Sequence, residues 1–238
     1  MAHPGAVDLF QAHFGLGKRD APDEDEGHNE KRARNDVYEV RDIKDSWGDV
    51  DGKMWLKNGN PHRENGLPAV IRDNGAKEWW YNGKKHREND LPAVEDVYGK
   101  EWWYNDERHR ENDFPAVITP YKREWWYHNQ RHRENDLPAV EDAYGGREWY
   151  YHNQLHREND EPAIEEADGY KAWYYNGRMH RMSGPAVIKP NGSKQYWFNG
   201  YHFRDPNVYW KRIQLMTPEE PFTSVTLPDA VDSGLGIT

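Results

Sequence analysis

The chain has 238 residues, a net charge of −10 and no cysteine, and only 35% of its residues are hydrophobic. The missing cysteine excludes disulfides, thiolate metal sites and cysteine nucleophiles. Twelve Trp and fifteen Tyr stand against few aliphatic residues, which argues against an ordinary aliphatic core and against a fully disordered chain. The acidic balance argues against a nucleic-acid binder, which needs a basic surface.

Residues 1–35 are predicted to be an acidic tail that is disordered or ordered only by a partner, because residues 20–34 are charged and lack periodicity. The apolar pattern at residues 5–16 suits a short helix that forms on binding a partner, but a tail that stays unstructured is favoured. Residues 31–34 (Lys-Arg-Ala-Arg) are a weak nuclear import signal. Residues 1–10 lack the features of a secretory signal, and no stretch approaches the ~18 apolar residues of a membrane span. We therefore expect an intracellular protein without membrane insertion.

Residues 36–50 are predicted to form a leading strand or cap, because polar and apolar residues alternate over 37–43. A repeat then begins and extends over residues 51–204. The pair His-Arg recurs six times, followed by a degenerate copy at His202, with 22–24 residues between successive histidines. Pro-Ala follows six of the copies, and an aromatic triplet precedes them. Repeats of this regularity predict a tandem architecture.

Each unit has the signals of a β-hairpin. Between the triplet at residues 79–81 (Trp-Trp-Tyr) and His86 lies the pair Asn82-Gly83, and the second member of this pair is Gly, Asn or Asp in every unit. Such pairs adopt the positive φ of a tight type I′ loop. A second turn separates the units, as at Asp51-Gly52. Turns about 11 residues apart leave no room for a helix of ordinary length.

We therefore predict an all-β fold. About seven tandem hairpins of 22–24 residues form one elongated, twisted antiparallel sheet, with irregular N- and C-terminal arms. Because side chains alternate between faces along a strand, both faces carry aromatic rows, which suits a thin sheet without a second layer.

The loop at Asn82-Gly83 fixes a register in which Trp79 faces His86 and Glu78 faces Arg87. Indole–imidazole and carboxylate–guanidinium pairs across strands would each contribute roughly 0.2–1 kcal/mol. The predicted cross-strand partners are His86, His109, His132, His156, Arg87, Arg110, Arg133 and Arg157.

The unit resembles the MORN repeat in its length of about 23 residues and in its aromatic, Asn-Gly and Gly positions. It departs from the usual eukaryotic unit, because Arg stands after His86 and His109 where Gly is normal. The HRENDxPA variant is more similar to marseillevirus-like arrays of large DNA viruses of amoebae, and distantly to bacterial antitoxin-type arrays. The resemblance implies a single-sheet scaffold for protein contacts without an active site, and the departure weakens any lipid-binding role.

Three chemical hypotheses follow from the repeated side chains. Equivalent histidines lie two strands apart, roughly 10 Å, too far to share a zinc ion with bonds of about 2.0–2.1 Å; we expect no metal and no cofactor. Recurring glutamates, such as Glu88, form no cleft on an open sheet and are expected to pair with arginines. No catalytic residues are predicted.

The Trp ladder is the third hypothesis. Stacking on nucleobases or sugars competes with structural stacking, which is favoured, and with a protein-binding face, because Trp, Tyr and Arg are enriched at interfaces. The candidate binding and stacking ladder comprises Trp79, Trp80, Trp102, Trp103, Trp125, Trp126, Trp149, Trp173 and Trp197.

Residues 205–238 leave the repeat. The segments at 208–210 and 213–216 are predicted to cap the end of the sheet, as repeat arrays require, and the Pro-rich remainder is predicted to be an extended arm.

Overall, the sequence predicts a non-enzymatic structural or adaptor scaffold that contacts proteins, including shell or scaffold proteins or further copies of itself. The viral resemblance implies a minor, capsid-associated component of a virus particle, in the virion or the host cytoplasm. The alternative is an antitoxin-like or immunity-like inhibitor that binds one toxic, basic partner. The two differ in stoichiometry, because a shell component makes many contacts and an inhibitor forms a discrete pair.

Overall fold

A computed structural model describes residues 35–216 of the chain. The predictions for the acidic tail, for residues 5–16 and for residues 31–34, and that of the extended arm beyond residue 216, lie outside the described residues.

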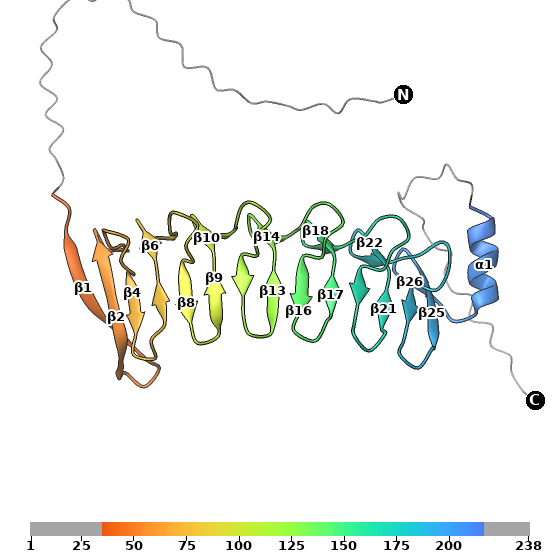
Figure 1. Ribbon diagram of the computed structural model, residues 1–238, viewed down its shortest axis with the longest axis horizontal. Helices are drawn as coiled ribbons and strands as arrows, with labels where there is room; N and C mark the ends of the chain where they lie inside the picture. Colours follow the sequence, from red (N-terminus) through yellow and green to blue (C-terminus); the bar gives the residue numbers. More distant parts are fainter. Residues whose placement is uncertain (1–34, 217–238) are drawn as a thin grey trace, which may run out of the picture. The chain divides into compact units, whose positions relative to one another are not determined.

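The predicted all-β fold is confirmed for this range. One long, open antiparallel sheet contains sixteen strands, fifteen of them side by side in chain order, while β3 (Asn60–Pro61) pairs with β2 off this path (Figure 1). The strands in order are β1 (Tyr38–Lys44), β2 (Val50–Lys57), β4 (Val70–Arg72), β5 (Lys77–Glu78), β8 (Val94–Asp96), β9 (Gly99–Glu101), β12 (Val117–Ile118), β13 (Lys122–Glu124), β16 (Val140–Asp142), β17 (Arg147–Glu148), β20 (Ile164–Glu165), β21 (Lys171–Ala172), β24 (Val187–Ile188), β25 (Lys194–Phe198) and β26 (Tyr201–Phe203).

Five small two-stranded hairpins lie along one side of this main sheet (Figure 1). Their tips are the predicted two-residue loops; Asn82 and Gly83 have φ of 47° and 82°, as a type I′ turn requires. The hairpins are β6 (Trp80–Tyr81) with β7 (Lys84–Lys85), β10 (Trp103–Tyr104) with β11 (Glu107–Arg108), β14 (Trp126–Tyr127) with β15 (Gln130–Arg131), β18 (Tyr150–Tyr151) with β19 (Gln154–Leu155), and β22 (Tyr174–Tyr175) with β23 (Arg178–Met179).

The chain changes from the main sheet to the small hairpin at the first Trp of each triplet. The backbone N–H of Trp79 donates to the carbonyl of Ala93, next to β8 of the main sheet, at 2.8 Å, whereas its carbonyl accepts from the N–H of His86 in its own small hairpin at 3.1 Å. The predicted simple alternation through the triplet is therefore wrong, because the first Trp bonds to two different ladders and the strand is interrupted there.

The core is a row of tryptophans packed on small side chains. The Ala of each Pro-Ala pair, such as Ala93, is completely buried, and the first Trp of each triplet is 5–7% exposed. These buried rings supply large apolar surfaces to the core.

At the N-terminal end, β1 confirms the predicted leading strand. The turn predicted at Asp51-Gly52 is wrong, because both residues lie inside β2 and the chain turns at 45–49 instead. Gly52 has φ of 144°, and a Cβ there would meet the carbonyl oxygen of Ile71 at 2.3 Å. Glycine is required here by the close approach of β4 and not by a turn.

At the other end, the predicted irregular segment contains a helix, α1 (Pro206–Gln214) (Figure 1). The carboxylate of Asp205 accepts from the N–H of Asn207 at 2.8 Å and caps the helix, with Pro206 at its first position. Tyr209 is fully buried, and its hydroxyl donates to the carbonyls of Arg181 and Gly184. Residues 208–210 thus cover the end of the sheet, in helical form.

Candidate functional site

The segment that begins with the Arg of each His-Arg pair forms a loop, here called the REND loop, that projects beside the small hairpins. In the loop of residues 133–136, Asn135 and Asp136 have φ of 62° and 55°. Asn and Asp tolerate this left-handed conformation better than other non-glycine residues. Equivalent loops are residues 87–90, 110–113 and 157–160, and the first copy, 63–66, ends in Gly.

The left-handed pair aims each loop at the next repeat. The indole N–H of Trp149 donates to the backbone carbonyl of Asp136 at 3.0 Å. The guanidinium of Arg157 donates to both oxygens of the Asp136 carboxylate, at 2.8 and 3.0 Å, and lies 3.8 Å from the centre of the Trp149 ring. Bidentate Arg–carboxylate contacts are strong and geometrically specific. Successive repeats are therefore joined by one charge-assisted clamp and one indole hydrogen bond.

The same clamp joins four pairs of repeats, through Arg110–Asp90, Arg133–Asp113, Arg157–Asp136 and Arg181–Asp160. The hydrogen bonds from Arg110 lower the pKa of Asp90 against a smaller effect of burial, and those from Arg181 do the same for Asp160. The first loop has Gly66 in place of Asp, and Arg87 instead contacts Glu95 at 3.1 Å.

These contacts correct the predicted carboxylate–guanidinium pairs. Glu78, Glu101 and Glu124 contact the residue two positions before the predicted arginine, which is Lys85, Arg108 and Arg131 respectively. The predicted register itself holds in the small hairpins, where Trp80 pairs with Lys85. The predicted pairs fail for the residues before the first Trp of the triplet, because these residues belong to the main sheet and not to the small hairpin.

The histidines use both ring nitrogens, and Nδ1 links each repeat to the next. In His156, Nε2 contacts the Glu158 carboxylate at 3.0 Å, and Nδ1 accepts the backbone N–H of Asn176 in the next hairpin at 3.1 Å. The acceptor role of Nδ1 places the ring proton on Nε2. The same Nδ1 contact recurs at His62, His86, His109, His132 and His180.

The predicted packing of histidine on tryptophan is therefore wrong for these repeats, although their backbones do pair. The ring contacts of His86 are with Tyr81 and Tyr104, at 6.4 and 5.0 Å between centroids. The glutamates expected to pair with arginine, such as Glu88, contact histidine instead. In the degenerate last copy an imidazole does stack on an indole, His202 on Trp197 at 4.6 Å.

The second aromatic residue of each triplet forms a separate outer row. Trp103 lies between Lys85 and Arg108, whose cations are 5.0 and 4.8 Å from its ring, and its N–H donates to Glu101 at 2.8 Å. Cations and rings alternate in this way from Trp80 to Tyr150. The row loses its cation at Leu155, which occupies the position of Arg131.

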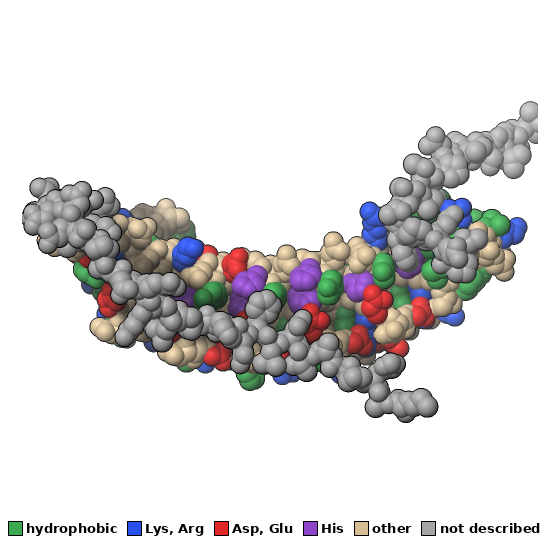
Figure 2. Space-filling model, turned by 90° about the horizontal axis from the view of Figure 1, so that it is seen from above, with side chains coloured by type: hydrophobic (Ala, Val, Ile, Leu, Met, Phe, Trp, Pro, Cys, Tyr) green, Lys and Arg blue, Asp and Glu red, His purple; other side chains and the backbone are tan. Residues whose placement is uncertain are grey.

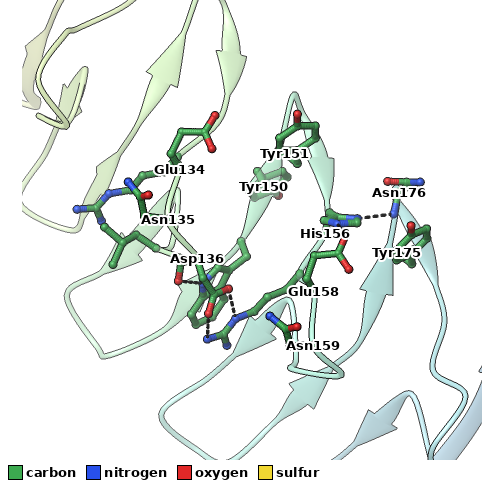
Figure 3. A pocket seen from close by; sticks show the side chains of 14 residues that line it. Glu134, Asn135, Asp136, Tyr150, Tyr151, His156, Glu158, Asn159, Tyr175 and Asn176 are labelled. Atoms are coloured by element: carbon green, nitrogen blue, oxygen red, sulfur yellow. Dashed lines mark hydrogen bonds and ion pairs between the residues drawn. The ribbon is translucent and has the colours of Figure 1, made fainter. Parts of the chain in front are cut away.

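Grooves separate successive REND loops. The largest, about 560 Å³, lies between the loops of residues 133–136 and 157–160 (Figure 3), with Trp149, Tyr151 and His156 in its wall. Smaller grooves of about 170 Å³ recur at the equivalent positions of two other repeats. All are open, polar-rimmed and periodic, which suits recognition of an extended partner better than enclosure of one small substrate.

We call the surface formed by these loops and the small hairpins the loop face. It carries a row of exposed tyrosines, at 46–55% exposure: Tyr81, Tyr104, Tyr127 and Tyr151. Between them run the histidines, which follow one another along the array (Figure 2). The glutamates of the REND loops are also exposed, with Glu134 at 71% for its side chain. Tyrosine and carboxylate therefore dominate what a partner would meet.

The predicted Trp ladder is divided by this geometry. Trp79, Trp102, Trp125, Trp149 and Trp173 are buried beneath arginines and are not available as a platform. Trp80, Trp103, Trp126 and Trp197 are half-buried. The tyrosine row was not singled out from the sequence, although its position at the end of every triplet, next to the turn, was available as a signal.

Within residues 35–216, no group of three or more His, Asp or Glu side chains is arranged to hold a metal ion. The helix found in this part of the chain is too short and too polar to cross a membrane.

No protein-family model matches the sequence. No curated protein shows significant sequence similarity to it.

Proposed function

We propose that this protein is a non-enzymatic, MORN-type scaffold that binds other proteins along its loop face. The observation that carries the proposal is the row of half-exposed tyrosines, repeated at the 22–24-residue period beside open grooves. Tyrosine is enriched at protein interfaces because it gives a large contact area and a polar end at little entropic cost. A partner that contacts several repeats would gain avidity from equivalent weak sites.

The resemblance to viral repeat arrays extends this proposal to a minor component of a virus particle. A shell or scaffold protein would then be the partner. A single toxic enzyme held in a one-to-one complex is the competing expectation, and stoichiometry separates the two.

Photo-cross-linking tests the proposal with a matched control. A benzophenone amino acid replaces either Tyr127 on the loop face or Tyr121 at the turn between main-sheet strands; these residues are 46% and 64% exposed. We expect the probe at position 127 to cross-link partner proteins in native extract or particles, identified by mass spectrometry. The probe at position 121 is expected to give none of them.

Many cross-links to an abundant shell protein would support the structural component. One stoichiometric partner that is a basic enzyme, inactive in the complex, would replace it with the inhibitor. Equal yields from both positions, or none from position 127 in an extract that retains the native assembly, would contradict a binding role for the loop face.

A further inference from the structure

The N-terminal end of the main sheet is an open edge. The carbonyl of Val37 accepts from the N–H of Asn58 in the chain next to it at 2.8 Å, so the odd-numbered residues of β1 exchange hydrogen bonds with β2. In an antiparallel pair the residues between them point their backbone groups the other way. These are Tyr38, Val40 and Asp42, and no strand of residues 35–216 pairs with them.

This edge lacks most of the usual protection against pairing. Edge strands are normally short, charged, interrupted by proline or bulged, and of these features β1 has its charged residues and the register shift at Lys44. β1 is seven residues long without proline, and its ladder with β2 is regular from Tyr38 to Ile43, shifting register only at Lys44. Val37, Tyr38 and Val40 are 63%, 55% and 55% exposed. At the opposite end the last strand, β26, has three residues and contacts α1.

We propose that two copies of this chain associate by antiparallel pairing of their β1 strands about a two-fold axis at Val40. In this register Glu39 of each copy faces Arg41 of the other. Val37 faces Ile43 of the second copy, and Tyr38 faces its Asp42. Opposite charges and apolar pairs directly across an antiparallel ladder are stabilising.

The sequence of β1 is self-complementary in this register and not in its neighbours. A two-fold axis at Arg41 would place Arg41 opposite Arg41, an axis at Glu39 would place Glu39 opposite Glu39, and an axis at Asp42 would oppose two aspartates. Like charges directly opposite are destabilising. Glu39 and Arg41 already contact each other within the strand at 2.5 Å, so pairing would produce a square of four alternating charges.

The backbone supports the same register. Tyr38–Asp42, Val40–Val40 and Asp42–Tyr38 would be the hydrogen-bonded residue pairs, giving about six new backbone bonds. The two main sheets would become one continuous sheet. Because the pairing uses the same edge on both copies and the far end contacts α1, the assembly closes as a dimer and does not extend into a fibre.

Sedimentation of the full-length chain from about 1 to about 200 µM tests the pairing. We expect a shift with concentration from the 28.2 kDa monomer toward twice that mass. Glu39→Arg and Arg41→Glu each place two like-charge pairs across the ladder and are expected to weaken dimerisation at least ~10-fold. An equimolar mixture of the two variants is expected to dimerise again, because each then faces the opposite charge.

Glu161→Arg is the control, since it makes the same charge change on an exposed residue in the loop of another repeat; it should sediment as the wild type does. A wild-type chain that stays monomeric throughout, or variants that dimerise unchanged, would overturn the pairing. So would a mixture that remains as monomeric as its components. The pairing uses the sheet edge and not the loop face, so its failure would leave the proposed function untouched.

Discussion

The two tryptophans of a triplet are adjacent in sequence but belong to different parts of the molecule. Trp125 is 6% exposed, lies beneath Arg133 and donates its indole N–H to the loop of the preceding repeat. Trp126 is half-buried, contacts cations of two hairpins and donates to Glu124 two residues away. The first Trp of each triplet, here called the inner row, is the same in five repeats, whereas the outer row changes at Tyr150 and Leu155.

The difference shows which contacts define the fold. An inner-row residue joins the main sheet to the small hairpin through its backbone, and it joins its repeat to the preceding one through its indole N–H, so every repeat needs it. An outer-row residue covers one surface of a hairpin whose turn already fixes its conformation. The outer row varies, and its loss leaves the Arg–Asp clamps and the indole hydrogen bonds between repeats intact.

Truncating one member of each row should give the largest contrast. Trp125→Ala removes a buried ring and its inter-repeat bond and is expected to cost about 3–5 kcal/mol of unfolding free energy. Trp126→Ala should cost about half as much or less, because the ring is already partly solvated. Urea denaturation followed by circular dichroism measures both. Equal losses would show that burial does not separate the rows.

The arginines of the two rows should differ in the same direction. Arg133→Ala breaks the bidentate clamp on Asp113 and uncovers Trp125, and we expect a loss of about 1–2 kcal/mol, since Asp113 is partly solvated. Arg131→Ala is expected to cost less, because the Arg131 side chain is more exposed than that of Arg133 and Lys122 still pairs with the buried Glu124. Arg133→Lys keeps the charge without the planar fork; full rescue by lysine would argue against the clamp geometry.

Acid should lower the stability of the array through the buried imidazole of His180. Burial lowers the pKa of His180 below its ordinary value of 6.5, so between these two pKa values the unfolded chain binds more protons than the folded one. Stability therefore falls as the pH drops below 6.5, because protonation of Nδ1 would displace the N–H of Asn199. Thermal unfolding should lose less between pH 7.5 and 5.5 in His180→Gln than in the wild type.

His202→Gln provides the matched control, because this imidazole is exposed in the last hairpin. Its pH slope should equal that of the wild type. Parallel slopes for all three proteins would remove His180 as the source of the acid sensitivity.

The smallest expected effect is a gain in stability from a substitution in the outer row. Leu155→Arg places a cation opposite Tyr150 and beside Glu148, as Arg131 does one repeat earlier, and should stabilise by about 0.5 kcal/mol. Burial, followed by the hydrogen bond and charge of Glu148, raises the pKa of Tyr150 to about 12. The added charge should lower that pKa, which ultraviolet titration of the phenol measures. A pKa that does not move would show that the new cation points elsewhere.

The sequence predicted the elements that depend on local chemistry. Asn82-Gly83 and its equivalents require positive φ, and the hairpins form at those positions with the predicted pairing of Trp80 and Lys85. The all-β repeat fold followed from these turns and their spacing.

The side-chain pairs that were predicted wrongly share one physical cause. Nothing in local periodicity indicates that Trp79 donates to one ladder and accepts from another, and every partner assigned beyond it was shifted as a result. The Asn-Asp pair before Pro was the available signal for a turn in the REND loop, because both residues tolerate positive φ. The helix α1 was missed although Asp205-Pro206 is a good helix start. The candidate site moved accordingly, from buried indoles to exposed tyrosines.

The clamps of the REND loops reach one repeat onward and no further. Removal of residues 102–124 would leave Glu101 followed by Trp125, which restores the local sequence, and would bring Asp90 opposite Arg133 in place of Arg110. The array can thus gain or lose whole units by genetic slippage without a single new type of contact. Each such event would change the inherited length of the array by one repeat. The distance between partners bound at its two ends would change by the same step.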